Sequence, residues 1–135
     1  MGSNEGQAQA GQPEWVCAHE QLSRLAKARA ALDAEEGRWL LCALRSAAYL
    51  HLGFASFAEY VGVLFGYKPR STEEKLRVAE ALEELPELER ALSDGSLSWS
   101  AVRELTRVVA PETQTEWLAA ARGRTARQIE ELSRG

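Results

Sequence analysis

The spacing of the apolar residues constrains the fold of this chain more than any other feature of its sequence. From Glu14 onward, apolar side chains recur every three or four positions, which places them on one face of an amphipathic α-helix. No segment combines apolar and polar alternation with flanking turn residues, the pattern typical of a half-buried strand. The sequence therefore predicts an all-α fold, a single-domain bundle of about seven helices.

The N-terminal part of this pattern predicts two helices. The first begins at Glu14, and Arg29 fills one gap in its apolar stripe. Asp33 is suited to cap a second helix, in which the segment Arg38 to Leu52 is apolar on nearly every side. Such a segment is typical of the interior of a bundle, so we expect it to be the central helix, ended by Gly53. The stripe of the first helix consists of Trp15, Ala18, Leu22, Leu25 and Leu32.

Two capping-box sequences predict a helical hairpin in the middle of the chain. Ser56 with Glu59, and Ser71 with Glu74, have the S-x-x-E spacing in which the two side chains satisfy free backbone N–H groups at a helix start. Gly66 is expected to end the first helix, because glycine tolerates the left-handed backbone found there. The inward face of that helix is predicted to be Phe57, Tyr60, Val61, Leu64 and Phe65.

The C-terminal half contains further start and stop signals. Proline is tolerated at the first position of a helix, serine and threonine are good caps, and an Asp-Gly pair favours a turn. These signals predict helix starts at Pro86, Ser98, Pro111 and Thr125 with Gln128, and turns at Asp94-Gly95 and Gly123.

The length and the amino-acid composition of the chain fit one globular domain. A chain of 135 residues with 45% hydrophobic residues is sufficient for a single core. Residues 1–13 have nothing to bury and are predicted to be a disordered leader, which leaves 14–135 as the helical domain. The leader lacks the features of a signal peptide, no apolar run approaches the roughly 18 residues of a membrane span, and two cysteines are too few for a disulfide framework. We therefore expect a cytoplasmic protein.

The residues required for catalysis do not occur at suitable spacings. The available zinc ligands are Cys17, His19, Cys42 and His51, and on helices these residues point apart or lie too far from one another to converge on a metal. Neither histidine accompanies a nucleophile motif, and no Gly-rich phosphate loop is present. The sequence predicts no metal, no cofactor and no enzymatic activity.

The segment GYKPRSTEEKLR, Gly66 to Arg77, predicts a candidate DNA-contact site. Its layout is that of a helix-turn-helix, in which the start of the second helix reads base edges and nearby cations hold phosphates. Glu73 and Glu74 count against this interpretation, and an ordinary capped hairpin remains the alternative. The predicted base readers are Ser71, Thr72 and Lys75, and the predicted phosphate anchors are Lys68, Arg70 and Arg77.

A second basic cluster surrounds the predicted Gly123 turn. Arg122, Arg124 and Arg127 are suited either to extend a DNA-binding stripe or to complement the dipole of a helix end. The formal net charge of −4 argues against a broad electropositive surface, so any contact with nucleic acid is expected to be local.

Three strings in the chain carry a family resemblance. FAEYVGVLFGYKPRSTEEKLRVAEALEELPELERAL, LSWSAVRELTRV and PETQTEWLAAARGRTARQIEEL, about 75 of the 135 residues, closely resemble the helical region that precedes the nuclease domain in bacterial HNH endonuclease-like proteins. The portion Gly66 to Ala101 is also similar, more faintly, to the helix-turn-helix segment of ParB-type partition proteins. The resemblance implies association with DNA. It does not imply nuclease activity, because the chain has no segment with the metal-binding residues of the HNH motif.

Two functions are therefore expected from the sequence. The first is a helical module that binds double-stranded DNA or positions a target for an HNH-type nuclease, the chain being either the first part of a longer protein or a relative without the catalytic half. The alternative is a protein-interaction or homo-oligomerisation module, because the stripe of the first helix is close to a heptad seam and the acidic composition suits it. In that case the first helix is expected to pair with a second copy of itself.

Overall fold

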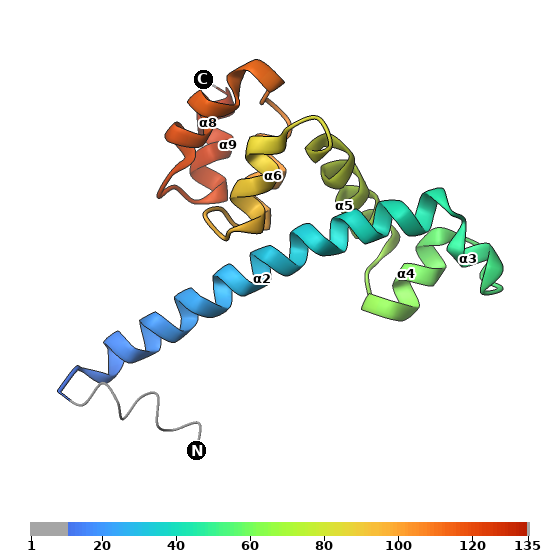
Figure 1. Ribbon diagram of the computed structural model, residues 1–135, viewed down its shortest axis with the longest axis horizontal. Coiled ribbons are helices and arrows are strands. Elements are labelled where there is room, and N and C mark those ends of the chain that lie inside the picture. The colour runs from blue at the N-terminus through green and yellow to red at the C-terminus, as the bar shows by residue number, and fades with distance from the viewer. Residues whose placement is uncertain (1–10, 135) are drawn as a thin grey trace.

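The computed structural model describes residues 11–134, and within this range it contains eight α-helices, one 3-10 turn and no strand. The fold is an all-α single domain, as predicted. Figure 1 shows one long helix, α2, that crosses the whole structure, with the other helices packed along part of its length. Residues 1–10 of the predicted leader lie outside the described residues. The helices are α2 (Glu14–Arg45), α3 (Ala48–His51), α4 (Phe57–Phe65), α5 (Pro69–Leu82), α6 (Pro86–Ser93), α7 (Trp99–Leu105), α8 (Gln114–Ala121) and α9 (Ala126–Arg134), with the 3-10 turn at Pro111–Thr113.

Helix α2 is continuous where two helices were predicted, so the predicted start at Asp33 is wrong. Gly37, which weakens a helix by about 1 kcal/mol relative to alanine, lies in the middle of α2 and allows close approach of α5. A Cβ atom at this position would lie only 3.1 Å from the Cβ of Ala79. Packing on α5 and α6 therefore stabilises α2 through this point.

The predicted central helix ends early, at Arg45, and Ala47 adopts a left-handed backbone with φ of 57°. A short helix, α3, follows and ends at His51, two residues before Gly53, which also has positive φ. Leu40 and Leu41 are buried, but Leu50 and Leu52 are exposed. The apolar run 38–52 therefore divides between core and surface, and it does not form one buried helix.

Helix α4 begins and ends where the sequence predicts. The Ser56 hydroxyl accepts a hydrogen bond from the Glu59 backbone N–H, and the Glu59 carboxylate accepts one from the Ala55 N–H. Gly66 has φ of 75° and its N–H donates to the Gly62 carbonyl. Only the inward face differs from the prediction. Phe57 and Val61 are buried and Tyr60 is half-buried, whereas Leu64 and Phe65 are exposed.

Helix α5 begins two residues before its predicted capping box. Pro69 occupies its first position, with Lys68 as the capping residue, and no side chain among residues 11–134 caps this end. Ser71 and Glu74 therefore lie inside the helix, and the capping box predicted for them is wrong. Proline fixes φ near −65° and needs no N–H partner, so Pro69 starts the helix before Ser71 is reached.

The remaining helices largely follow their predicted signals. Ser98 caps α7 through the Ala101 N–H, and Thr125 and Gln128 exchange two hydrogen bonds before α9. Pro111 opens a 3-10 turn, and α8 starts only at Gln114. The Gln114 side chain is buried and its carbonyl accepts from two backbone N–H groups at the start of α6. It caps a helix distant in sequence.

Two apolar clusters hold the fold together. The larger is formed where α2, α5, α6, α7, α8 and α9 meet, around Leu88, Val102 and Ile129, each at most 1% exposed. The smaller joins α2 to α4 through Leu40, Phe57 and Val61. The N-terminal half of α2 contributes no residue to either cluster before Ala30, and Figure 1 shows it projecting beyond the other helices.

Candidate functional site

The predicted DNA-contact residues on α5 are not all available to a partner. Lys68, Arg70 and Ser71 are exposed at the start of the helix. Thr72 is 2% exposed, so in this conformation its side chain cannot reach a base edge. Its hydroxyl has no hydrogen-bond partner among the described residues. The structure thus leaves three of the predicted contact residues together on the surface and places Thr72 in the interior.

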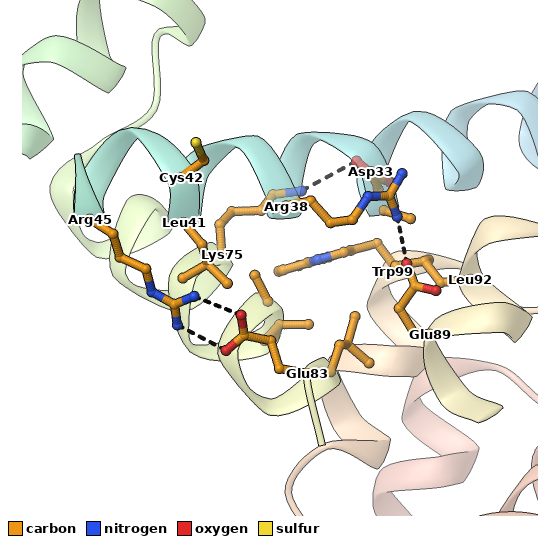
Figure 2. A pocket seen from close by; sticks show the side chains of 15 residues that line it. Asp33, Arg38, Leu41, Cys42, Arg45, Lys75, Glu83, Glu89, Leu92 and Trp99 are labelled. Atoms are coloured by element: carbon orange, nitrogen blue, oxygen red, sulfur yellow. Dashed lines mark hydrogen bonds and ion pairs between the residues drawn. The ribbon is translucent and has the colours of Figure 1, made fainter. Parts of the chain in front are cut away.

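Lys75 points into a cavity of about 430 Å³ between α2, α5 and α6, as Figure 2 shows. Its ammonium lies 3.4 Å from the Asp33 carboxylate and 4.0 Å from the centre of the Trp99 ring. Both members of the ion pair are mostly covered, with 16% and 20% of their side chains exposed. Lys75 is therefore held by the protein itself.

Two further ion pairs lie at the rim of this cavity. Arg45 of α2 contacts Glu83 with two hydrogen bonds of 2.7 and 2.8 Å, and Arg38 contacts Glu89 at 2.6 Å. Because the Glu83 carboxylate accepts from Arg45, the pKa of Glu83 is lowered and that of Arg45 is raised. Every charged group that lines the cavity has a partner of opposite charge. The cavity thus contains no unpaired charged group, and Cys42, which also lines it, is a free thiol.

Arg77 also has partners within the fold. It donates two hydrogen bonds to Glu74, of 2.9 and 3.1 Å, and one each to the Thr106 hydroxyl and the Arg103 carbonyl. Arg107 reaches the same Glu74 carboxylate at 2.8 Å. The hydrogen bond from Arg77 and the charges of the surrounding arginines lower the pKa of Glu74. Arg77 therefore joins α5 to α7 and is not a free cation.

The second basic cluster is far from the first. Arg122 and Arg124 are exposed between α8 and α9, and Arg127 is exposed in the first turn of α9. Figure 1 shows α8 and α9 well apart from α4, on the far side of α6. Arg127 approaches Glu131 at 3.9 Å, and neither Arg122 nor Arg124 forms an ion pair with a described residue. The structure does not bring the two predicted clusters into one stripe.

An apolar stripe runs along the exposed side of α2. Trp15, Leu22, Leu32 and Trp39 are between 64% and 72% exposed, and Leu25 is 48% exposed. The residues of α2 that face the larger cluster, such as Ala30 and Ala34, each lie two positions from Leu32, or about 160° around the axis. The stripe and the core therefore occupy opposite sides of the helix. We call Trp15, Ala18, Leu22, Leu25, Arg29, Leu32, Glu36 and Trp39 the α2 seam.

The C-terminal end of the α2 seam borders an apolar groove. This groove has a volume of about 450 Å³ and is walled by α4, which contributes Tyr60, Leu64 and Phe65. At its edge the Tyr67 hydroxyl donates a 2.8 Å hydrogen bond to the Glu36 carboxylate. Burial, and then this bond, raise the pKa of Tyr67 to about 12. The bond fixes the position of Glu36 within the seam.

The sequence reasoning missed the α4 wall of this groove. Leu64 and Phe65 were assigned to the core because they continue the spacing of Phe57 and Val61, yet they are 58% and 47% exposed. Trp39 was assigned to a buried helix and is 64% exposed. One signal was available, because Trp39 lies seven residues after Leu32 and so extends the stripe by one heptad.

Comparison of this chain with protein-family models, with curated proteins and with solved structures finds no match. The resemblance to HNH-associated and ParB-type proteins therefore stays a prediction. Within residues 11–134, no cluster of three His, Cys, Asp or Glu side chains is placed to hold a metal ion, and no helix is long and apolar enough to cross a membrane. Cys17 and Cys42 are free thiols.

Proposed function

We propose that this chain is a helical protein-interaction module that binds an apolar helix along the α2 seam and the adjoining groove of α4. The observation that carries the proposal is the exposure of five large apolar side chains on one side of one helix. Folded monomers seldom expose contiguous apolar patches larger than a few hundred Å² unless the patch has a binding role.

The projecting half of α2 supports the same proposal. Up to Ala26 this helix contributes no residue to either apolar cluster, whereas Lys27 lies against Gly95 in the α6–α7 turn. A helical segment of about 13 residues is only marginally stable in water without tertiary packing. A partner that covers Trp15, Leu22 and Leu25 would stabilise it and remove apolar surface from water.

The test is binding of a probe helix. A fluorescein-labelled designed peptide of four heptads, with leucine at the first and fourth position of each, would be titrated with the full chain and followed by anisotropy. We expect saturable binding that Leu22→Glu and Leu32→Glu each weaken at least about tenfold, since a carboxylate in an apolar interface loses its hydration. Leu50→Glu is the matched control, because Leu50 on α3 is 58% exposed, close to the 65% of Leu22 and Leu32, and lies outside the seam. Absence of binding to the probe helix, or an equal loss with the control, refutes the proposal.

DNA contact is the second candidate function. The observation that favours it is the exposure of Lys68, Arg70 and Ser71 at the N-terminal end of α5, where neither cation forms an ion pair with a described residue. A helix N-terminus attracts phosphate, and the resemblance to HNH-associated proteins supports a role in positioning a DNA target for such a nuclease.

The salt dependence of DNA binding tests this second candidate. If the start of α5 holds phosphates of double-stranded DNA, Lys68→Ala and Arg70→Ala should each reduce the slope of log K against log salt by about one unit. Arg24→Ala, an exposed cation on α2, is the control. An unchanged slope in both α5 variants would exclude this contact. In neither case do we propose a catalytic role. We propose a cytoplasmic setting, which suits the two free thiols.

A further inference from the structure

We propose that the helix bound by the α2 seam is the α2 helix of a second copy of this chain, in antiparallel orientation. This inference rests on the proposed function and names the partner of that surface. It follows from the heptad register of α2, from two charged residues inside the seam, and from the position of the groove next to α4.

The α2 seam keeps a strict heptad register over its whole exposed length. Trp15, Leu22, Arg29 and Glu36 occupy the a positions, and Ala18, Leu25, Leu32 and Trp39 occupy the d positions, with spacings that alternate between four and three. Such a register is the pattern by which two helices pack side by side. It extends across the bounds of α2 as one uninterrupted helix.

The charged a positions disfavour a parallel pair. In a parallel, in-register pair each a residue meets its own copy, so Arg29 would face Arg29 and Glu36 would face Glu36 in the same apolar layer. Like charges placed together in an interface repel each other and suppress the wrong arrangement. A parallel homodimer is therefore unfavourable.

One antiparallel register converts these charges into ion pairs. It places Leu22 opposite Trp39, Leu25 opposite Glu36, and Arg29 opposite Leu32 of the second copy. Arg29 and the second copy's Glu36 are then about 6 Å apart along the axis, or four residues. Helical side chains lean toward the N-terminus of their own helix, so in antiparallel helices these two lean toward each other. The two-fold symmetry makes the pair twice.

Neighbouring antiparallel registers lack this pairing. A shift by one heptad in one direction moves Glu36 of the second copy roughly 16 Å from Arg29. A shift in the other direction brings the two Glu36 side chains together, leaning toward each other. The charges of the seam thus select a single register, which is the role that polar residues at a positions have in paired helices.

The same register covers the groove next to α4. It places Ala18 and Leu22 of one copy over Ala43 and Trp39 of the other, beside Leu64 and Phe65. The projecting N-terminal half of α2 in each copy therefore fills the groove next to α4 in the other copy. Trp15 and Trp39 alone expose roughly 300 Å² of each copy at about 200 Å² per ring, more than a third of the roughly 800 Å² each partner contributes to a standard interface.

Sedimentation equilibrium of the full chain between about 1 and 100 μM, a range that detects micromolar dissociation constants, is the first test. We expect a dimer of twice 14.9 kDa, converted to monomer by Leu22→Glu and left intact by Leu50→Glu. Arg29→Glu and Glu36→Arg should each raise the dissociation constant at least about tenfold, because each creates two like-charge contacts. The double variant Arg29→Glu, Glu36→Arg should restore it to within about threefold, since the pair is only exchanged.

Each outcome separates the proposals. A monomer at about 100 μM that still binds the designed leucine helix refutes self-association and leaves the interaction module standing, whereas a monomer that binds no helix refutes both. A dimer that Leu22→Glu does not dissociate places the interface elsewhere. A double charge exchange that fails to restore the dimer refutes the register. Tyr67→Phe controls for loss of the hydrogen bond to Glu36 and should leave the dissociation constant unchanged.

Discussion

Replacement of Lys75 by methionine should destabilise the fold, although lysine is normally a surface residue. Methionine keeps most of the apolar stem and removes the charge. The ammonium of Lys75 lies 4.0 Å from the centre of the Trp99 ring and 3.4 Å from the Asp33 carboxylate, and the substitution removes both interactions. It also leaves Asp33 mostly covered without its cation.

The two interactions of the Lys75 ammonium determine how much unfolding free energy the substitution is expected to remove. A cation over a tryptophan face contributes about 0.5 kcal/mol at an exposed site and about 2 kcal/mol when desolvated. The ion pair with Asp33 is intermediate between an exposed pair, at about 0.2–1 kcal/mol, and a buried one, whose disruption costs about 3–5 kcal/mol. We therefore expect Lys75→Met to lower the free energy of unfolding by about 2–3 kcal/mol.

Urea unfolding followed by circular dichroism at 222 nm measures this loss. Arg70→Met is the matched control, because Arg70 is an exposed cation on the same helix without an ion-pair partner among the described residues, and it should change the stability by at most about 0.5 kcal/mol. A double-mutant cycle with Asp33→Asn should give a coupling energy of about 1 kcal/mol. If Lys75→Met and Arg70→Met have the same small effect, Lys75 is not held in the cavity and is available for contact with DNA.

Three further predictions concern stability. Gln114→Met should cost about 2–3 kcal/mol in urea unfolding, because two backbone N–H groups at the start of α6 lose their acceptor; a loss below about 1 kcal/mol would contradict this capping role. The pKa of Glu74 is lowered in the fold from 4.5 by the hydrogen bond of Arg77, so its stabilisation is complete above pH 4.5 and disappears as the pH falls through the lowered value. Thermal melts from pH 7 to 2 should show a shallower acid destabilisation for Glu74→Gln than for the wild type, and identical profiles would exclude this source. Gly95→Ala should destabilise by about 2 kcal/mol or more, since φ is 80° and the new Cβ would lie 2.6 Å from Lys27 Cβ; a variant as stable as the wild type would show that this turn relaxes freely.

Local signals predicted many helix ends correctly. Ser56, Ser98 and Thr125 each cap a helix as expected, and Gly66 and Gly95 adopt the positive φ that their positions require. These features depend on residues within four positions of one another, so the sequence contains all the information needed. The same reasoning failed at Ser71, where Pro69, two residues earlier, offers a competing start.

The candidate site was only partly accessible to sequence reasoning. The stripe on the first helix was predicted, because its period is a property of the chain. Its exposure was not, because exposure depends on whether another helix lies against that face. Lys75 was predicted to read DNA bases because it is a cation near the start of a helix. Its partners Asp33 and Trp99 lie in distant parts of the chain. No spacing rule connects these three residues.

The sequence by itself determined that the chain is all-helical, where most helices begin and end, and that α2 has a heptad stripe. Period, capping and turn propensity are local quantities, with energies set by neighbouring residues. The tertiary structure alone decided that α2 is one helix through Gly37, that Lys75 and Arg77 are held inside the fold, and that Trp39, Leu64 and Phe65 face outward. The physical reason is that burial and pairing are decided by whichever element packs against a residue, and here those elements lie tens of residues away along the chain.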